Sequence, residues 1–194
     1  MNIAAREGKL FPVEIGVWVV VLGELFVFSL FFATFLYYRS LSPELFDASR
    51  ATLRQDLGAI NTIILLASSW FVATAVQKLG TAGKRQQALS YLVCALTCGV
   101  AFVAVKVFEY GVAAINGLNV LTDSFYMFYF MLTGIHLMHL LVGLGLLAGT
   151  TVHLKNALAR DCALNEELIG FSSSFWHMVD IVWILLFPLL YLLQ

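Results

Sequence analysis

Charged residues are scarce in this chain of 194 residues: only 12% are Asp, Glu, Lys or Arg, and 61% are hydrophobic. A soluble domain carries about 25% charged residues, so roughly half of the usual charge is missing. The 3 cysteines form no metal-binding pair, and the net charge of −1 gives no reason to expect a nucleic-acid partner. The composition excludes a soluble enzyme, an extracellular disulfide scaffold and an intrinsically disordered chain.

The few charged residues are also absent from long stretches. No Asp, Glu, Lys or Arg occurs in residues 57–76, 88–105 or 124–152, and only one occurs in each of residues 15–38 and 168–194. Apolar stretches of about 18 or more residues cross a bilayer as helices, which satisfy every backbone group internally. The sequence therefore predicts an all-α membrane protein, a bundle of five transmembrane helices.

The predicted helices form one transmembrane domain that covers residues 1–194. Their expected bounds are about 13–38, 57–79, 88–113, 124–153 and 168–193. The longest connections, near 39–56 and 154–167, contain charges of both signs and are expected to be solvated loops. No internal repeat is present, which argues against an inverted-repeat transporter.

The distribution of basic residues predicts how the bundle is oriented. Cytoplasmic segments of membrane proteins carry an excess of Lys and Arg. With the N-terminus inside, seven basic residues lie in inner segments and three in outer ones. The inner residues are Arg6, Lys9, Lys78, Lys84, Arg85, Lys155 and Arg160, and the outer ones are Arg39, Arg50 and Arg54. We therefore expect a cytoplasmic N-terminus and an outside C-terminus.

Five titratable residues fall deep inside the predicted helices: Glu24, His136, His139, His177 and Asp180. Such residues are costly in lipid, so they are expected to face protein and one another. His136 and His139 are three residues apart and share a helix face, and the same holds for His177 and Asp180. We expect a buried polar cluster that joins the first, fourth and fifth helices.

Three functions remain open for this cluster. Histidines from two helices could bind a haem, although only 4 histidines are available in the whole chain. The carboxyl and imidazole groups could instead form a proton path. The cluster could also be purely structural, with each polar group satisfying another. No metal site is predicted on this chain.

Two further patterns concern contacts between helices. Lys106 and Glu109 are three residues apart near the outer end of the third helix, where they are expected to form an ion pair. Gly143, Gly145 and Gly149 lie in the fourth helix, and the last two form a GxxxG pair. Small residues at this spacing let helix backbones approach closely in lipid, so all three are expected to mark helix packing.

Several of these residues lie in motifs that resemble subunit III of the haem–copper oxidases, the cytochrome c oxidase subunit III family. Residues 175–183 read Phe-Trp-His-Met-Val-Asp-Ile-Val-Trp, which is similar to the family's aromatic-Trp-His-x-Val-Asp-x-x-Trp signature. Residues 133–143 match its Thr-Gly-x-His-x-x-His-x-x-x-Gly motif. Residues 23–28 are similar to the segment that carries the family's carbodiimide-reactive glutamate, which falls on Glu24.

The resemblance implies an accessory subunit without redox cofactors. In the family, subunit III packs against catalytic subunit I, supports its integrity during turnover and assists proton uptake in aerobic electron transport. Haem and copper are then expected in the partner subunit, and phospholipid around or bound to this one. The expected location is the bacterial inner (plasma) membrane.

Two branches of the family remain open. Five-helix members include quinol oxidase subunits and accessory proteins of nitric oxide reductase. The segments 11–16 and 187–191 are similar to the nitric-oxide-reductase branch. Many members carry an acidic residue before the final signature, where this chain has Ser172, Ser173 and Ser174. A different class of function, a small proton-coupled transporter, would use the same polar cluster.

Overall fold

The computed structural model describes residues 15–81, 83–160 and 163–193, and this part of the chain is helical without strands. The elements in order are α1 (Ile15–Leu41), α2 (Pro43–Ala51), α3 (Gln55–Leu79), α4 (Arg85–Ile115), α5 (Ser124–Arg160), α6 (Glu166–Phe187) and the π-helical segment η1 (Pro188–Leu192). Five of the helices, α1 and α3–α6, are long and apolar enough to cross a membrane. The all-α, five-helix prediction is confirmed.

One expected loop contains a helix of its own. The segment predicted as the solvated loop 39–56 includes α2, which begins at Pro43 and buries Phe46. Proline suits the first helical turn because its missing N–H has no partner there in any case. The ion pair between Arg39 and Asp47, at 3.3 Å, ties α2 to the end of α1.

The fourth transmembrane helix is longer than expected. It ends at Arg160 rather than near 153, since no proline or glycine interrupts residues 150–160. The first charged residues after an apolar stretch indicate where the chain leaves the lipid. The helix itself can continue into water beyond that point. The prediction of a loop starting at 154 is therefore wrong.

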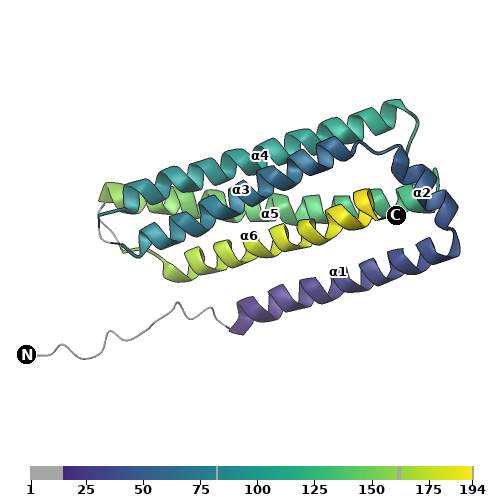
Figure 1. Ribbon diagram of the computed structural model, residues 1–194. Helices are drawn as coiled ribbons and strands as arrows, with labels where there is room; N and C mark the ends of the chain where they lie inside the picture. Colours follow the sequence, from purple (N-terminus) through teal and green to yellow (C-terminus); the bar gives the residue numbers. More distant parts are fainter. Residues whose placement is uncertain (1–14, 82, 161–162, 194) are drawn as a thin grey trace, which may run out of the picture.

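Helices α3, α4, α5 and α6 pack side by side, and α1 lies along one side of this group (Figure 1). Trp176 and Trp183 of α6 are fully buried among apolar side chains of the other three helices. In the apolar segment of α6, 56% of the residues are buried, against 11% in that of α1. Helix α1 is therefore a peripheral helix whose apolar side chains mostly face outward.

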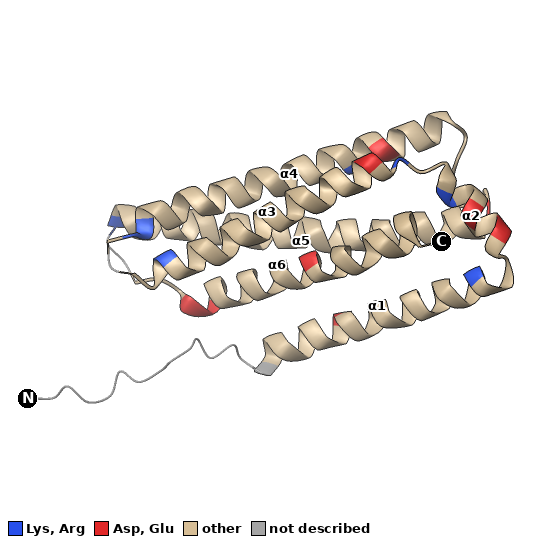
Figure 2. Ribbon diagram, in the orientation of Figure 1, with Lys and Arg blue, Asp and Glu red and all other residues tan. Residues whose placement is uncertain are grey.

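Charged residues gather at the two ends of the bundle, with few between them (Figure 2). Lys78, Lys84 and Arg85 lie at the junction of α3 and α4, and α2 lies at the opposite end (Figure 1). Arg6 and Lys9 fall outside the described residues. The direction in which the chain crosses the membrane stays a prediction.

The three glycines of α5 have different surroundings. A Cβ atom on Gly143 would lie 3.0 Å from Trp176 Cε3, so this glycine lets α6 approach closely. Gly145 and Gly149 have nothing within 4 Å of such a Cβ atom. The prediction that Gly145 and Gly149 mark a close helix contact does not hold among the described residues. The GxxxG spacing defines one face of a helix, but it does not say whether another helix covers that face.

Candidate functional site

Glu24 of α1 and His139 of α5 form a polar contact between the peripheral helix and the bundle. His139 Nε2 lies 3.1 Å from Glu24 Oε2, and His139 Nδ1 lies 2.8 Å from the carbonyl oxygen of Ile135. A carbonyl oxygen can only accept a hydrogen bond, so Nδ1 must be the donor. The contact at Nε2 then needs one further proton, held by the imidazole or by the carboxyl group. The contact between the two side chains is therefore a single hydrogen bond.

The Glu24–His139 pair is only partly enclosed. The side chain of His139 is 15% exposed and that of Glu24 is 34% exposed. The rings of Phe28 and Phe175 lie beside the imidazole, at centroid distances of 5.6 and 6.5 Å. The apolar rings exclude water on the bundle side, while the carboxyl group remains open at the surface of the chain.

His177 and Asp180 form a second polar group on α6. His177 Nδ1 is 2.8 Å from the hydroxyl of Ser69 on α3 and 3.8 Å from Asp180 Oδ2. Asp180 is buried, and neither of its carboxyl oxygens has a hydrogen-bond partner in the described structure. This group therefore joins α6 to α3.

His136 stands apart from both groups. Its ring lies against Trp183 and Phe102, at centroid distances of 5.0 and 5.8 Å, and neither ring nitrogen has a hydrogen-bond partner in the described structure. Positions three apart on an α-helix are rotated by about 60° relative to each other. His136 therefore faces the bundle interior while His139 faces α1. The single five-residue cluster predicted from the sequence is wrong: the residues form three separate groups.

Lys106 and Glu109 of α4 form the most enclosed polar group. Lys106 Nζ lies 2.9 Å from Glu109 Oε2, and the two side chains are 0% and 6% exposed. The hydroxyls of Tyr129 and Tyr191 donate to Glu109 Oε1 at 2.8 and 2.5 Å. Tyr191 also accepts from Lys106 Nζ at 3.0 Å. We call these four residues the Lys106 network.

The sequence pointed to the two charged members of this network and missed the two tyrosines. Tyr129 lies on α5 and Tyr191 in η1, so the network links α4, α5 and the C-terminal segment. The one clue in the sequence was that a tyrosine buried in a membrane helix needs a hydrogen-bond partner for its hydroxyl. No sequence spacing relates residues this far apart.

The histidines do not converge on a common centre. His139 contacts Glu24, His177 contacts Ser69, and His153 Nε2 accepts from the backbone N–H of Asn165 at 3.0 Å. Among the described residues there is no group of three or more His, Cys, Asp or Glu side chains that could hold a metal ion. The polar side chains therefore form hydrogen bonds that join one helix to another.

The fold and these polar groups define a multi-pass membrane protein with polar contacts between its membrane-length helices. The family model of cytochrome c oxidase subunit III matches residues 7–194, so the chain belongs to this family. The resemblance seen in the motifs at residues 133–143 and 175–183 is thereby confirmed.

Curated relatives match over almost the whole chain. Quinol oxidase subunit 3 of Bacillus subtilis (strain 168) is 28% identical over 185 residues, which cover 92% of this chain and 86% of that protein. Probable quinol oxidase subunit 3 of Staphylococcus aureus (strain USA300) is 26% identical over 195 residues, which cover 97% and 91%. These relatives do not support the expected similarity to the nitric-oxide-reductase branch. Together with the five apolar helices, they identify a multi-pass bacterial membrane protein.

Proposed function

We propose that this chain is subunit III of a bacterial haem–copper quinol oxidase. The family match over residues 7–194 carries the proposal, and the two quinol oxidase relatives support it because they align over most of their own length. The partner is then the catalytic subunit of the oxidase, which holds the haem and copper. This chain binds neither, and membrane lipid covers the apolar surface that the partner leaves free.

The role of the subunit in this proposal is to stabilise the catalytic subunit and to assist proton uptake. The Glu24–His139 pair supports the second part, since its two titratable side chains are joined by a hydrogen bond and its carboxyl group is partly open at the surface of the chain. The peripheral helix α1 supports the first part, because most of its apolar side chains have no partner in the described chain.

The assembly is tested by purifying the tagged chain from its native membranes in mild detergent. We expect a haem-containing catalytic subunit to co-purify, and the absorption spectrum to lose its haem bands when this chain is separated from that subunit. The preparation should oxidise a quinol with consumption of O₂. A haem spectrum that stays with the isolated chain would contradict the assignment of the cofactors to the partner.

The role is tested by removing the chain or a single carboxyl group from the complex. Deletion is expected to shorten the time for which the oxidase keeps its activity during turnover. Glu24→Gln should slow turnover, whereas Glu44→Gln, a change at an exposed glutamate of α2, should not. An oxidase whose rate and lifetime are unchanged by deletion would contradict the support role.

A further inference from the structure

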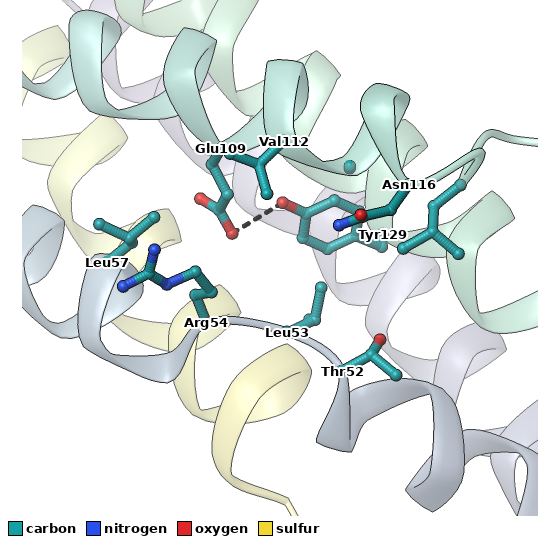
Figure 3. A pocket seen from close by; sticks show the side chains of 10 residues that line it. Thr52, Leu53, Arg54, Leu57, Glu109, Val112, Asn116 and Tyr129 are labelled. Carbon is teal, nitrogen blue, oxygen red and sulfur yellow. Dashed lines mark hydrogen bonds between the residues drawn. The ribbon is translucent and has the colours of Figure 1, made fainter.

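A small pocket opens at the α2 end of the bundle and reaches the Lys106 network. Its wall comes from α3, α4, α5 and the segments beside them, and it includes Glu109 and Tyr129 (Figure 3). The other lining residues are Thr52, Leu53, Arg54, Leu57, Val112, Ala113, Asn116 and Leu118. The space open to the centres of water molecules is about 30 Å³, enough for one or two waters.

The polar residues that line the pocket differ in burial. Arg54 and Asn116 are exposed residues, whereas Glu109 and Tyr129 are buried. Figure 3 shows the hydrogen bond between Tyr129 and Glu109 at the wall, with Arg54 on the opposite side. Hydroxyl, carboxylate and amide groups therefore line this space, and groups of this kind can bind a buried water.

The charged and titratable groups around Glu109 come from every element packed there. Lys106 and Tyr110 share α4 with it, Tyr129 comes from α5 and Tyr191 from η1. Arg54 precedes α3 and lines the pocket. Among the residues that line the pocket, the charged ones are Arg54 and Glu109, one of each sign.

This network is distinct from the Glu24–His139 pair. Tyr129 and His139 are ten residues apart on α5, which corresponds to about 15 Å along the helix axis. The Glu24–His139 pair lies between α1 and α5, whereas the pocket has no lining residue from α1.

We propose that the pocket is a hydrated inlet, and that through it the Lys106 network exchanges protons with water at the α2 end of the bundle. In the exchange, the Tyr129 O–H bond breaks and a new O–H bond forms with a proton from water. The proton released by the tyrosine passes to the water, so no net charge moves. The Lys106 network is then a proton-exchanging site in addition to the Glu24–His139 pair, and water reaches it only from the α2 end of the bundle.

The proposal is tested by thiol labelling in the intact complex in native membranes. Cys94, Cys98 and Cys162 are first replaced by alanine, and a single cysteine is then introduced by Val112→Cys or Val107→Cys. Both positions are valines of α4, but Val112 lines the pocket while Val107 is exposed on the apolar surface. The probe is sulfonatoethyl methanethiosulfonate, an anionic reagent that does not cross membranes.

Thiol reagents of this kind need a thiolate, which forms in water and not among apolar groups, so we expect about tenfold or faster labelling at Val112→Cys than at Val107→Cys. Labelling should occur from only one side of sealed vesicles. Equal rates at the two positions, or labelling of Val112→Cys equally from both sides, would overturn the inlet.

A second pair of variants tests the link to the network. Ala113→Leu fills the pocket, whereas Ala114→Leu adds the same side chain on an exposed position one residue further. Infrared spectra after transfer to D₂O follow the tyrosine hydroxyl bands. The Ala113→Leu change should slow their exchange about tenfold, and the Ala114→Leu change should leave it unaltered, because only the first closes the path to water. Equal exchange in both variants would show that protons reach the network by another route.

Discussion

The Lys106–Glu109 and Glu24–His139 pairs both lie inside membrane-length helices, but their surroundings differ. Lys106 and Glu109 are enclosed by the bundle, and two tyrosine hydroxyls complete the hydrogen bonds of the carboxylate. Glu24 is 34% exposed, and in the described part of the chain its hydrogen-bond partner is His139. The first pair cannot lose a member without leaving a charge in an apolar interior. Removing Glu24 breaks one hydrogen bond to His139, so the expected loss of unfolding free energy is smaller.

The difference follows from where each pair lies in the fold. Lys106 packs among aromatic rings, and its Nζ is 5.1 Å from the Tyr129 ring centroid and 5.2 Å from that of Trp183. These rings come from α5 and α6, so the network depends on the assembled bundle. The Glu24–His139 contact depends only on how α1 lies against α5.

The largest expected effect is that of Glu109→Gln. Removing one partner of a buried ion pair costs about 3–5 kcal/mol because the other charge is left uncompensated. We expect the free energy of unfolding of the subunit in detergent micelles to fall by this amount, as measured by denaturant titration. The double variant Lys106→Met, Glu109→Gln should recover most of the loss, since no buried charge remains. A single variant as stable as the original chain would contradict a sealed ion pair.

The same contrast between interior and surface applies to the glycines of α5, with a smaller effect. Gly143→Ala places a Cβ atom 3.0 Å from the buried Trp176 ring, and overpacking of this kind costs about 1–3 kcal/mol. Gly145→Ala meets no neighbour and should be neutral or slightly stabilising in the same unfolding measurement. Equal losses from the two changes would mean that a partner also covers Gly145.

The hydrogen bond between Ser69 and His177 belongs to the His177–Asp180 group and should contribute less. Hydrogen bonds between side chains of membrane helices contribute about 0.6 kcal/mol on average. Ser69→Ala should therefore lower the free energy of unfolding by about this amount. Ser90→Ala is the control, because the Ser90 hydroxyl donates within its own helix, to the carbonyl of Gln86. A loss of several kcal/mol at Ser69 would show that Asp180 also depends on this hydroxyl.

The helices of this fold could be predicted from the sequence because lipid imposes a simple rule. Uninterrupted apolar stretches mark where the chain crosses, and all five were found. Helix α2 could not be found in this way, since its residues are mixed in polarity and its position depends on Phe46 packing into the bundle. The end of α5 was also missed, because charge indicates the edge of the lipid and not the end of a helix.

The contacts between polar side chains could be predicted from the sequence only in part. The spacing of residues along one helix correctly predicted that Lys106 lies next to Glu109 and that His177 lies near Asp180. It could not show that Glu24 contacts His139, that Ser69 contacts His177, or that Tyr191 reaches Glu109. Those contacts are set by how the helices rotate and pack, which a single sequence does not contain. The family motifs supplied the identity of the residues but not their partners.

The smallest effect on stability is expected for Glu24→Gln, and this variant separates the two pairs most clearly. Glutamine can keep the hydrogen bond to His139, and such bonds between membrane helices contribute only about 0.6 kcal/mol on average, so the free energy of unfolding should change far less than in Glu109→Gln. The same variant should abolish labelling of the chain by a lipid-soluble carbodiimide, since Glu24 is the carboxyl group open at the surface of α1. Glu109 should not be labelled, because the bundle encloses it and its carboxyl group is paired with Lys106. Labelling that persists in Glu24→Gln would assign the reactive carboxyl group elsewhere and would remove the functional contrast between the pairs.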